Sequence, residues 1–112
     1  MTADRLATHL WVAAHLSLGS TRGIPMVVVR RGDPSRGAVL LKLYRPGIGC
    51  TVLTQVRDGE RLCWSRGTGP APVGEADADR YIARQIKVDP DLWVIEIDDR
   101  DGVHWVDGPL LA

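Results

Sequence analysis

The residues best suited to chemistry lie near the C-terminus, where carboxylates gather around a histidine. Carboxylates bind Mg²⁺ or Ca²⁺, and a carboxylate–histidine pair can transfer protons or hold a metal. The candidate ligands are Asp91, Glu96, Asp98 and His104. If residues 100–102 form the turn, Asp98 faces His104, whereas a tighter turn at 101–102 pairs Asp99 with it. Aspartates are also common in ordinary turns, and we favour that structural interpretation.

A second set of residues could bind an anion, because arginine forks match phosphate and carboxylate oxygens. The set surrounds one predicted hairpin and consists of Arg30, Arg31, Arg36 and Lys42. The isoelectric point of about 6.8 and the lack of an RNA-binding aromatic motif argue against a nucleic-acid partner. A solvated, ion-paired hairpin is therefore the favoured interpretation.

Other catalytic signatures are missing from the sequence. Cys50 and Cys63 are too few for a disulfide framework or a zinc site on their own. The Gly67–Gly69 segment lacks the Gly-Lys-Ser/Thr ending of a phosphate-binding loop, and no Gly-x-Ser-x-Gly motif is present. We therefore expect no cofactor, and a binding role is favoured over an enzymatic one.

Composition indicates one globular domain over residues 1–112, with 45% hydrophobic and 25% charged residues and zero net charge. No apolar run is long enough for a membrane helix, so we expect a cytoplasmic protein without a membrane partner. The charge is uneven along the chain: residues 1–66 hold ten Arg/Lys and four Asp/Glu, and residues 67–112 hold the reverse. This polarity fits an internal ion-pair surface, a head-to-tail contact, or separate sites for an anion and a cation; pairing of the two halves within one sheet is favoured.

The elements that must position these residues are mostly strands. Acids at the start, Lys87 near the end and an apolar stripe predict one clear helix over residues 75–88, which Pro90 terminates. Leu6–Leu18 alternates with period two, which favours a strand, although a helical stripe also fits; a loop follows at 19–23. Together these elements predict an α+β fold, in which the helix packs on a mainly antiparallel sheet built from hairpins.

Three hairpins are expected. Met26–Arg31 pairs with Ala38–Tyr44, and Leu92–Ile97 pairs with Val103–Val106. The third has Asp58-Gly59 as its turn, which places Arg57 opposite Glu60 and keeps the two cysteines apart.

Tryptophans on the predicted strands supply most of the aromatic bulk, since phenylalanine is absent. Core packing is the simplest role for them. Trp93 and Trp105, on strands expected to pair, could instead form a partner-facing surface and support a homodimer.

Several motifs resemble a known family. They are His9–Val12, Arg30–Pro34 with Gly37–Lys42, and Asp89–Ile97. Together they are similar to domain-of-unknown-function family 1491, over about Leu6 to Val106. The resemblance implies a small bacterial, cytoplasmic, single-domain protein and carries over no catalytic residue.

Three hypotheses follow. The first is a non-catalytic binding or protein-interaction module that uses a sheet edge or a tryptophan-bearing face. The second is a metal-dependent or acid–base enzyme that uses the C-terminal hairpin. The third is an anion or nucleic-acid binder that uses the arginine-rich hairpin.

Overall fold

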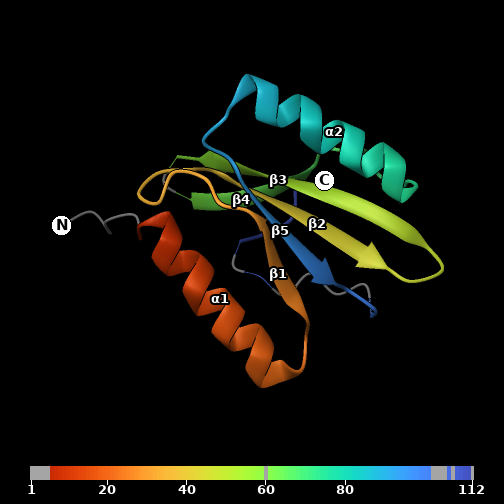
Figure 1. The fold of residues 1–112 in the computed structure, drawn as a ribbon, viewed down its shortest axis with the longest axis horizontal. Coiled ribbons are helices and arrows are strands. Elements are labelled where there is room, and N and C mark those ends of the chain that lie inside the picture. Colours follow the sequence, from red (N-terminus) through yellow and green to blue (C-terminus); the bar gives the residue numbers. More distant parts are fainter. Residues whose placement is uncertain (1–5, 60, 102–105, 107, 112) are drawn as a thin grey trace.

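A computed structural model describes residues 6–59, 61–101, 106 and 108–111. In chain order, the elements are α1 (Thr8–Arg22), β1 (Met26–Arg30), β2 (Val39–Arg45), β3 (Gly49–Asp58), β4 (Arg61–Arg66), α2 (Glu75–Val88) and β5 (Trp93–Asp98). The helices cover opposite faces of one five-stranded sheet, so the fold has three layers (Figure 1). This architecture confirms the α+β class, with two helices where one clear helix was expected. No helix in the described part of the chain is long and apolar enough to span a membrane.

The strand order is β1-β5-β2-β3-β4. All neighbouring pairs are antiparallel except β2 and β5, which run parallel. The expected hairpin between residues 26–31 and 38–44 is therefore wrong, because β5 lies between β1 and β2. Both edges of β5 are occupied, which leaves it no free edge for the expected partner at 103–106. Residues 103–105 of that segment lie outside the described residues.

The predicted helix at 75–88 is confirmed as α2. Its apolar stripe packs on the sheet as expected: Ala78, Tyr81, Ile82 and Ile86 all join one core cluster. Asp89, just before Pro90, is extended and ends the helix.

The prediction of a strand over Leu6–Leu18 is wrong, because this segment belongs to α1. Alanine and leucine favour a helix, and the helix continues through the expected loop at 19–23 until Gly23 caps it in the left-handed conformation. No side chain caps its N-terminus. Instead, the backbone N–H groups of Thr8 and His9 donate to the carbonyls of Ser35 and Pro34 at 3.2 and 2.9 Å.

Two hydrophobic clusters fill the spaces between the layers. Beneath α1, Trp11 and Val12 pack against alternate residues of the central strands and against Trp64 and Trp93. Beneath α2, Ala78 and Ile82 pack against the other residues of the same strands, among them Leu40, Val52 and Val94. The central strands are buried on both faces, which explains their nearly continuous apolar sequence.

The β3–β4 pair is present, with a register two residues away from the expected one. Asp58 pairs with Arg61 and Arg57 with Leu62, where the sequence predicted Arg57 opposite Glu60. A shift of two residues preserves the faces, so Leu53 and Trp64 still lie in one core cluster. Cys50 and Cys63 are both buried, free thiols.

The loop between β1 and β2 packs closely on the start of β5. A side chain at Gly32 or Gly37 would overlap the carbonyl oxygen of Asp91, so both positions require glycine. The Asp33 N–H donates to Asp91 O at 3.0 Å, and the indole N–H of Trp93 donates to Asp33 O at 2.7 Å. This loop therefore fixes the position of β5 beside β1.

Candidate functional site

The outer edge of β1 is the most accessible binding element of the sheet. In the part of the chain that the structure describes, β1 pairs only with β5, and nothing pairs with its other side. Val27 and Val29 point to the same face, and each is 58% exposed. Exposed β-branched side chains on an unpaired strand edge are typical of strand-pairing sites.

Hydrogen bonding to β5 determines which backbone groups face outward. The Asp98 N–H donates to Pro25 O at 3.0 Å, and Val27 pairs with Glu96. Because bonded positions alternate along an antiparallel pair, the N–H and C=O groups of Met26 and Val28 point away from β5. A bulge between Val28 and Arg30 ends this regular stretch. The open edge is therefore short and defined.

The opposite edge of the sheet is covered. The Trp64 N–H on β4 donates to Pro109 O at 2.9 Å, and the Leu111 N–H donates to Trp64 O at 2.7 Å. The C-terminal residues thus add a short parallel bridge beside β4. Among the described residues, β1 is therefore the sheet edge that remains available for strand pairing.

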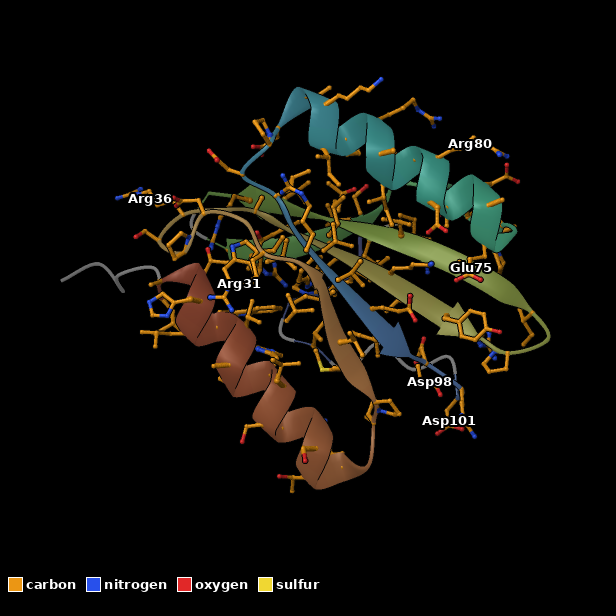
Figure 2. The ribbon with its side chains drawn as sticks, in the orientation of Figure 1. Arg31, Arg36, Glu75, Arg80, Asp98 and Asp101 are labelled. Carbon is orange, nitrogen blue, oxygen red and sulfur yellow. The ribbon has the colours of Figure 1, made fainter. Side chains whose placement is uncertain are left out.

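Two arginines of the proposed anion set have partners within the chain. The Arg30 Nη1 donates to Leu92 O at 2.6 Å, and the Arg31 guanidinium lies 5.2 Å from the centre of the Trp93 ring. The Arg36 backbone N–H donates to the Asp33 carboxylate at 2.7 Å. Arg31 and Arg36 lie at the loop end of the sheet in Figure 2, and Asp98 and Asp101 at the other.

Lys42, the fourth member of that set, lies between the sheet and α2. Its ammonium donates to Glu75 and Asp79 at 2.8 Å each and lies 3.4 Å from Glu96. Burial alone would lower the pKa of Lys42, but the hydrogen bonds that its ammonium donates to Asp79 and Glu75 outweigh burial and raise the pKa. The charge of Lys42 is therefore paired with three carboxylates of its own chain.

Cys50 shares the environment of Lys42. Burial raises the pKa of the Cys50 thiol, and the nearby ammonium of Lys42 acts weakly in the opposite direction. The thiol is therefore protonated at neutral pH, which is the unreactive form of a cysteine.

The candidate metal ligands are spread along β5. Asp91 is exposed before the strand, Glu96 faces Lys42, and Asp98 accepts from Arg100 Nε at 3.0 Å. Among the residues that the structure describes, no three His, Cys, Asp or Glu side chains are grouped to hold a metal ion. His104 lies outside those residues. An open cavity of about 610 Å³, lined by residues 22–25 and 98–101, lies where β5 ends beside Pro25.

The structure describes one of the two tryptophans that were expected to face a partner. Trp93 is 1% exposed and belongs to the core cluster beneath α1, so its ring is not on the surface. Its expected companion, Trp105, lies outside the described residues. The accessible apolar side chains of the sheet edge are the two valines of β1, which sequence reasoning placed on a strand without marking them as a site. Their short, β-branched run was visible in the sequence, but their position at an edge was not.

Fold and site together define a small three-layer α+β protein in which, among the residues that the structure describes, the outer edge of β1 is unpaired. Comparison with protein families matches residues 6–107 to DUF1491, described as a protein of unknown function. The chain belongs to this family, as the sequence resemblance indicated. A comparison with curated proteins gave no match.

Solved structures of family members have the same fold. A crystal structure of a DUF1491 family protein from Caulobacter crescentus is 33% identical, with a TM-score of 0.80, covering 96% of this chain and 98% of that one. An NMR structure of a DUF1491 family protein from the same organism is also 33% identical, with a TM-score of 0.84, covering 98% and 100%. A solution structure from A. tumefaciens, 20% identical with a TM-score of 0.70 over 85% and 86%, shares the fold.

Proposed function

We propose that this protein is a non-catalytic interaction module of the cytoplasm that binds an extended segment of polypeptide along β1. The observation that carries the proposal is the unpaired edge, with Met26 and Val28 offering backbone donors and acceptors and two valines exposed beside them. Adding a strand satisfies these groups and covers the valines. The buried free thiols of Cys50 and Cys63 fit a reducing compartment.

A proline at position 28 tests strand addition selectively. The Val28 N–H points outward, so Val28→Pro removes a donor from the open edge and leaves the bonds between β1 and β5 in place. Val28→Ala is the matched control, because it also removes the side chain from the core and keeps the N–H. Both purified variants should retain the wild-type circular dichroism spectrum.

Binding along β1 is measured by photo-cross-linking from position 29, in the cells that naturally make the protein. A benzophenone amino acid replaces Val29, whose side chain is exposed beside the edge. We expect a cross-linked adduct in the Val28→Ala background and its loss in the Val28→Pro background. Binding by strand addition would be contradicted if no background gave an adduct. It would also be contradicted if the adduct still formed in the Val28→Pro background.

A further inference from the structure

The open edge of β1 has a property that narrows the choice of partner: it is complementary to itself. Its outward backbone groups come from Met26 and Val28, which flank Val27 symmetrically. If two copies pair antiparallel about Val27, Met26 of each copy lies opposite Val28 of the other. All the outward N–H and C=O groups of Met26 and Val28 are then bonded, four hydrogen bonds in total. If the two copies instead paired about Val28, only the backbone groups of Val28 would form such hydrogen bonds.

The side chains fit the same alignment. Val27 of one copy lies directly opposite Val27 of the other, in a position where the backbones are close and the side chains touch. Both valines are exposed in the single chain, so pairing removes them from water. The strand contains no charged residue between Pro25 and Val29, so no like charges meet at the centre.

The charges at the two ends of β1 are also complementary. At the Arg30 end, three arginines (Arg30, Arg31 and Arg36) outnumber Asp33 and Asp91. At the Pro25 end, three aspartates (Asp98, Asp99 and Asp101) outnumber Arg22 and Arg100 around the open cavity. Antiparallel pairing exchanges the ends, so the basic end of each copy lies beside the acidic end of the other. This charge arrangement favours the antiparallel orientation of the two copies and speeds their association.

From these three features we infer that the segment bound along β1 is the β1 strand of a second copy, paired antiparallel about Val27. The inference rests on the proposed function and specifies its partner. A two-fold axis relates the copies, as in most homodimers, and the two sheets join into one continuous sheet.

A pair of cysteine substitutions tests the inference on the purified full chain. In the alignment about Val27, the two Cα atoms at position 27 are about 4.5 Å apart, within disulfide range. Val29 lies opposite Pro25 of the second copy, so the two positions 29 are separated by four residues, about 13 Å along the strand. Val29→Cys is therefore the matched control for Val27→Cys, with the same exposure on the same strand.

We expect Val27→Cys to form a disulfide-linked dimer in a glutathione buffer at least roughly tenfold faster than Val29→Cys, because pairing concentrates the facing thiols. The measurement is intact mass under non-reducing conditions. Adding Val28→Pro to Val27→Cys should abolish the difference, and adding Val28→Ala should not. Cys50 and Cys63 are buried and do not compete.

Two outcomes overturn the inference. One is equal or faster cross-linking of Val29→Cys, which places the copies in another register or in random collision. The other is slow cross-linking of both variants. If both are slow while the benzophenone at position 29 still gives a proline-sensitive adduct with a different protein, self-pairing fails and the interaction module stands. If neither assay gives an adduct, both fail.

Discussion

Lys42 is a buried charge surrounded by carboxylates. It is 5% exposed on β2, and its ammonium connects the sheet to the first turns of α2 through Glu75 and Asp79. A buried charge is tolerated only when it is paired, and removing one partner leaves the others without compensation. The three carboxylates are part-exposed, which limits the cost because water can solvate them.

Lys42→Met should lower the free energy of unfolding at pH 7 by about 1–3 kcal/mol, since a buried pair is broken beside solvated carboxylates. The folded-state pKa of Lys42 is raised above the ordinary 10.5. Its stabilising effect is therefore fully present below pH 10.5 and is lost as the pH rises through the higher folded-state value. Urea unfolding from pH 7 to 11.5 measures both effects.

Arg80→Met is the control for this change. Arg80 pairs with Asp77 on the exposed side of α2, where an ion pair contributes between 0 and about 1 kcal/mol. The interpretation of Lys42 would be wrong if the two variants lost the same stability, or if the deficit of Lys42→Met did not shrink above pH 10.5.

At the scale of elements, the loop of residues 31–38 organises both ends of the chain. Its carbonyls accept from the first N–H groups of α1, and its Asp33 bonds to the backbone before β5 and to Trp93. The Thr8 hydroxyl also donates to Gly37 O at 2.7 Å. One loop thus holds the N-terminal helix and the last strand in their places.

Gly37→Ala should destabilise the protein by about 1–3 kcal/mol, because its Cβ would overlap backbone atoms of Asp91 and Asp33 that cannot rotate away. Gly74→Ala is the comparison, since its Cβ has open space and its φ of −65° suits alanine. Thermal unfolding followed by circular dichroism distinguishes them. Equal melting temperatures for the two variants would contradict a close approach at Gly37.

At the scale of the whole molecule, the described part of the chain leaves the β1 edge of the sheet open and covers the β4 edge. If copies pair along β1, folding and association are coupled, and the melting temperature depends on concentration. A hundredfold increase in concentration over the range where pairs form should raise the melting temperature by about 5 °C. Val28→Pro should melt at one temperature throughout. Scanning calorimetry or fluorimetry makes the measurement, and a concentration-independent wild type would oppose a stable pair.

Local signals were enough to predict α2, most of the strands and the faces of β3 and β4. Acids at the helix start and Pro90 after its end act within a few residues. The same approach favoured a strand where α1 lies and left the helix as the alternative. Its N-terminal cap consists of carbonyls at Pro34 and Ser35, and the segment from Ala7 to Thr21 has no charged residue to mark an exposed face.

The candidate site depended on information that no local pattern contains. Hairpins are the usual connection between neighbouring strands, so placing β1 beside β2 followed a sound rule. Insertion of β5 between them is decided by contacts between residues distant in sequence, such as Met26 with Ile97 and Val39 with Trp93. The same insertion puts β1 at an edge of the sheet.

The central position of β5 also governs when the protein can fold during its synthesis. α1 and β1 emerge from the ribosome first, yet the strand that joins β1 to the rest of the sheet is made only when residues 93–98 are translated. Until then, β2, β3, β4 and α2 can associate among themselves, while β1 has no strand to pair with. Closure of the sheet over such a sequence distance is slow, because a long loop must be ordered before its contacts form. β1 therefore joins the sheet late, although it is the first strand to be made.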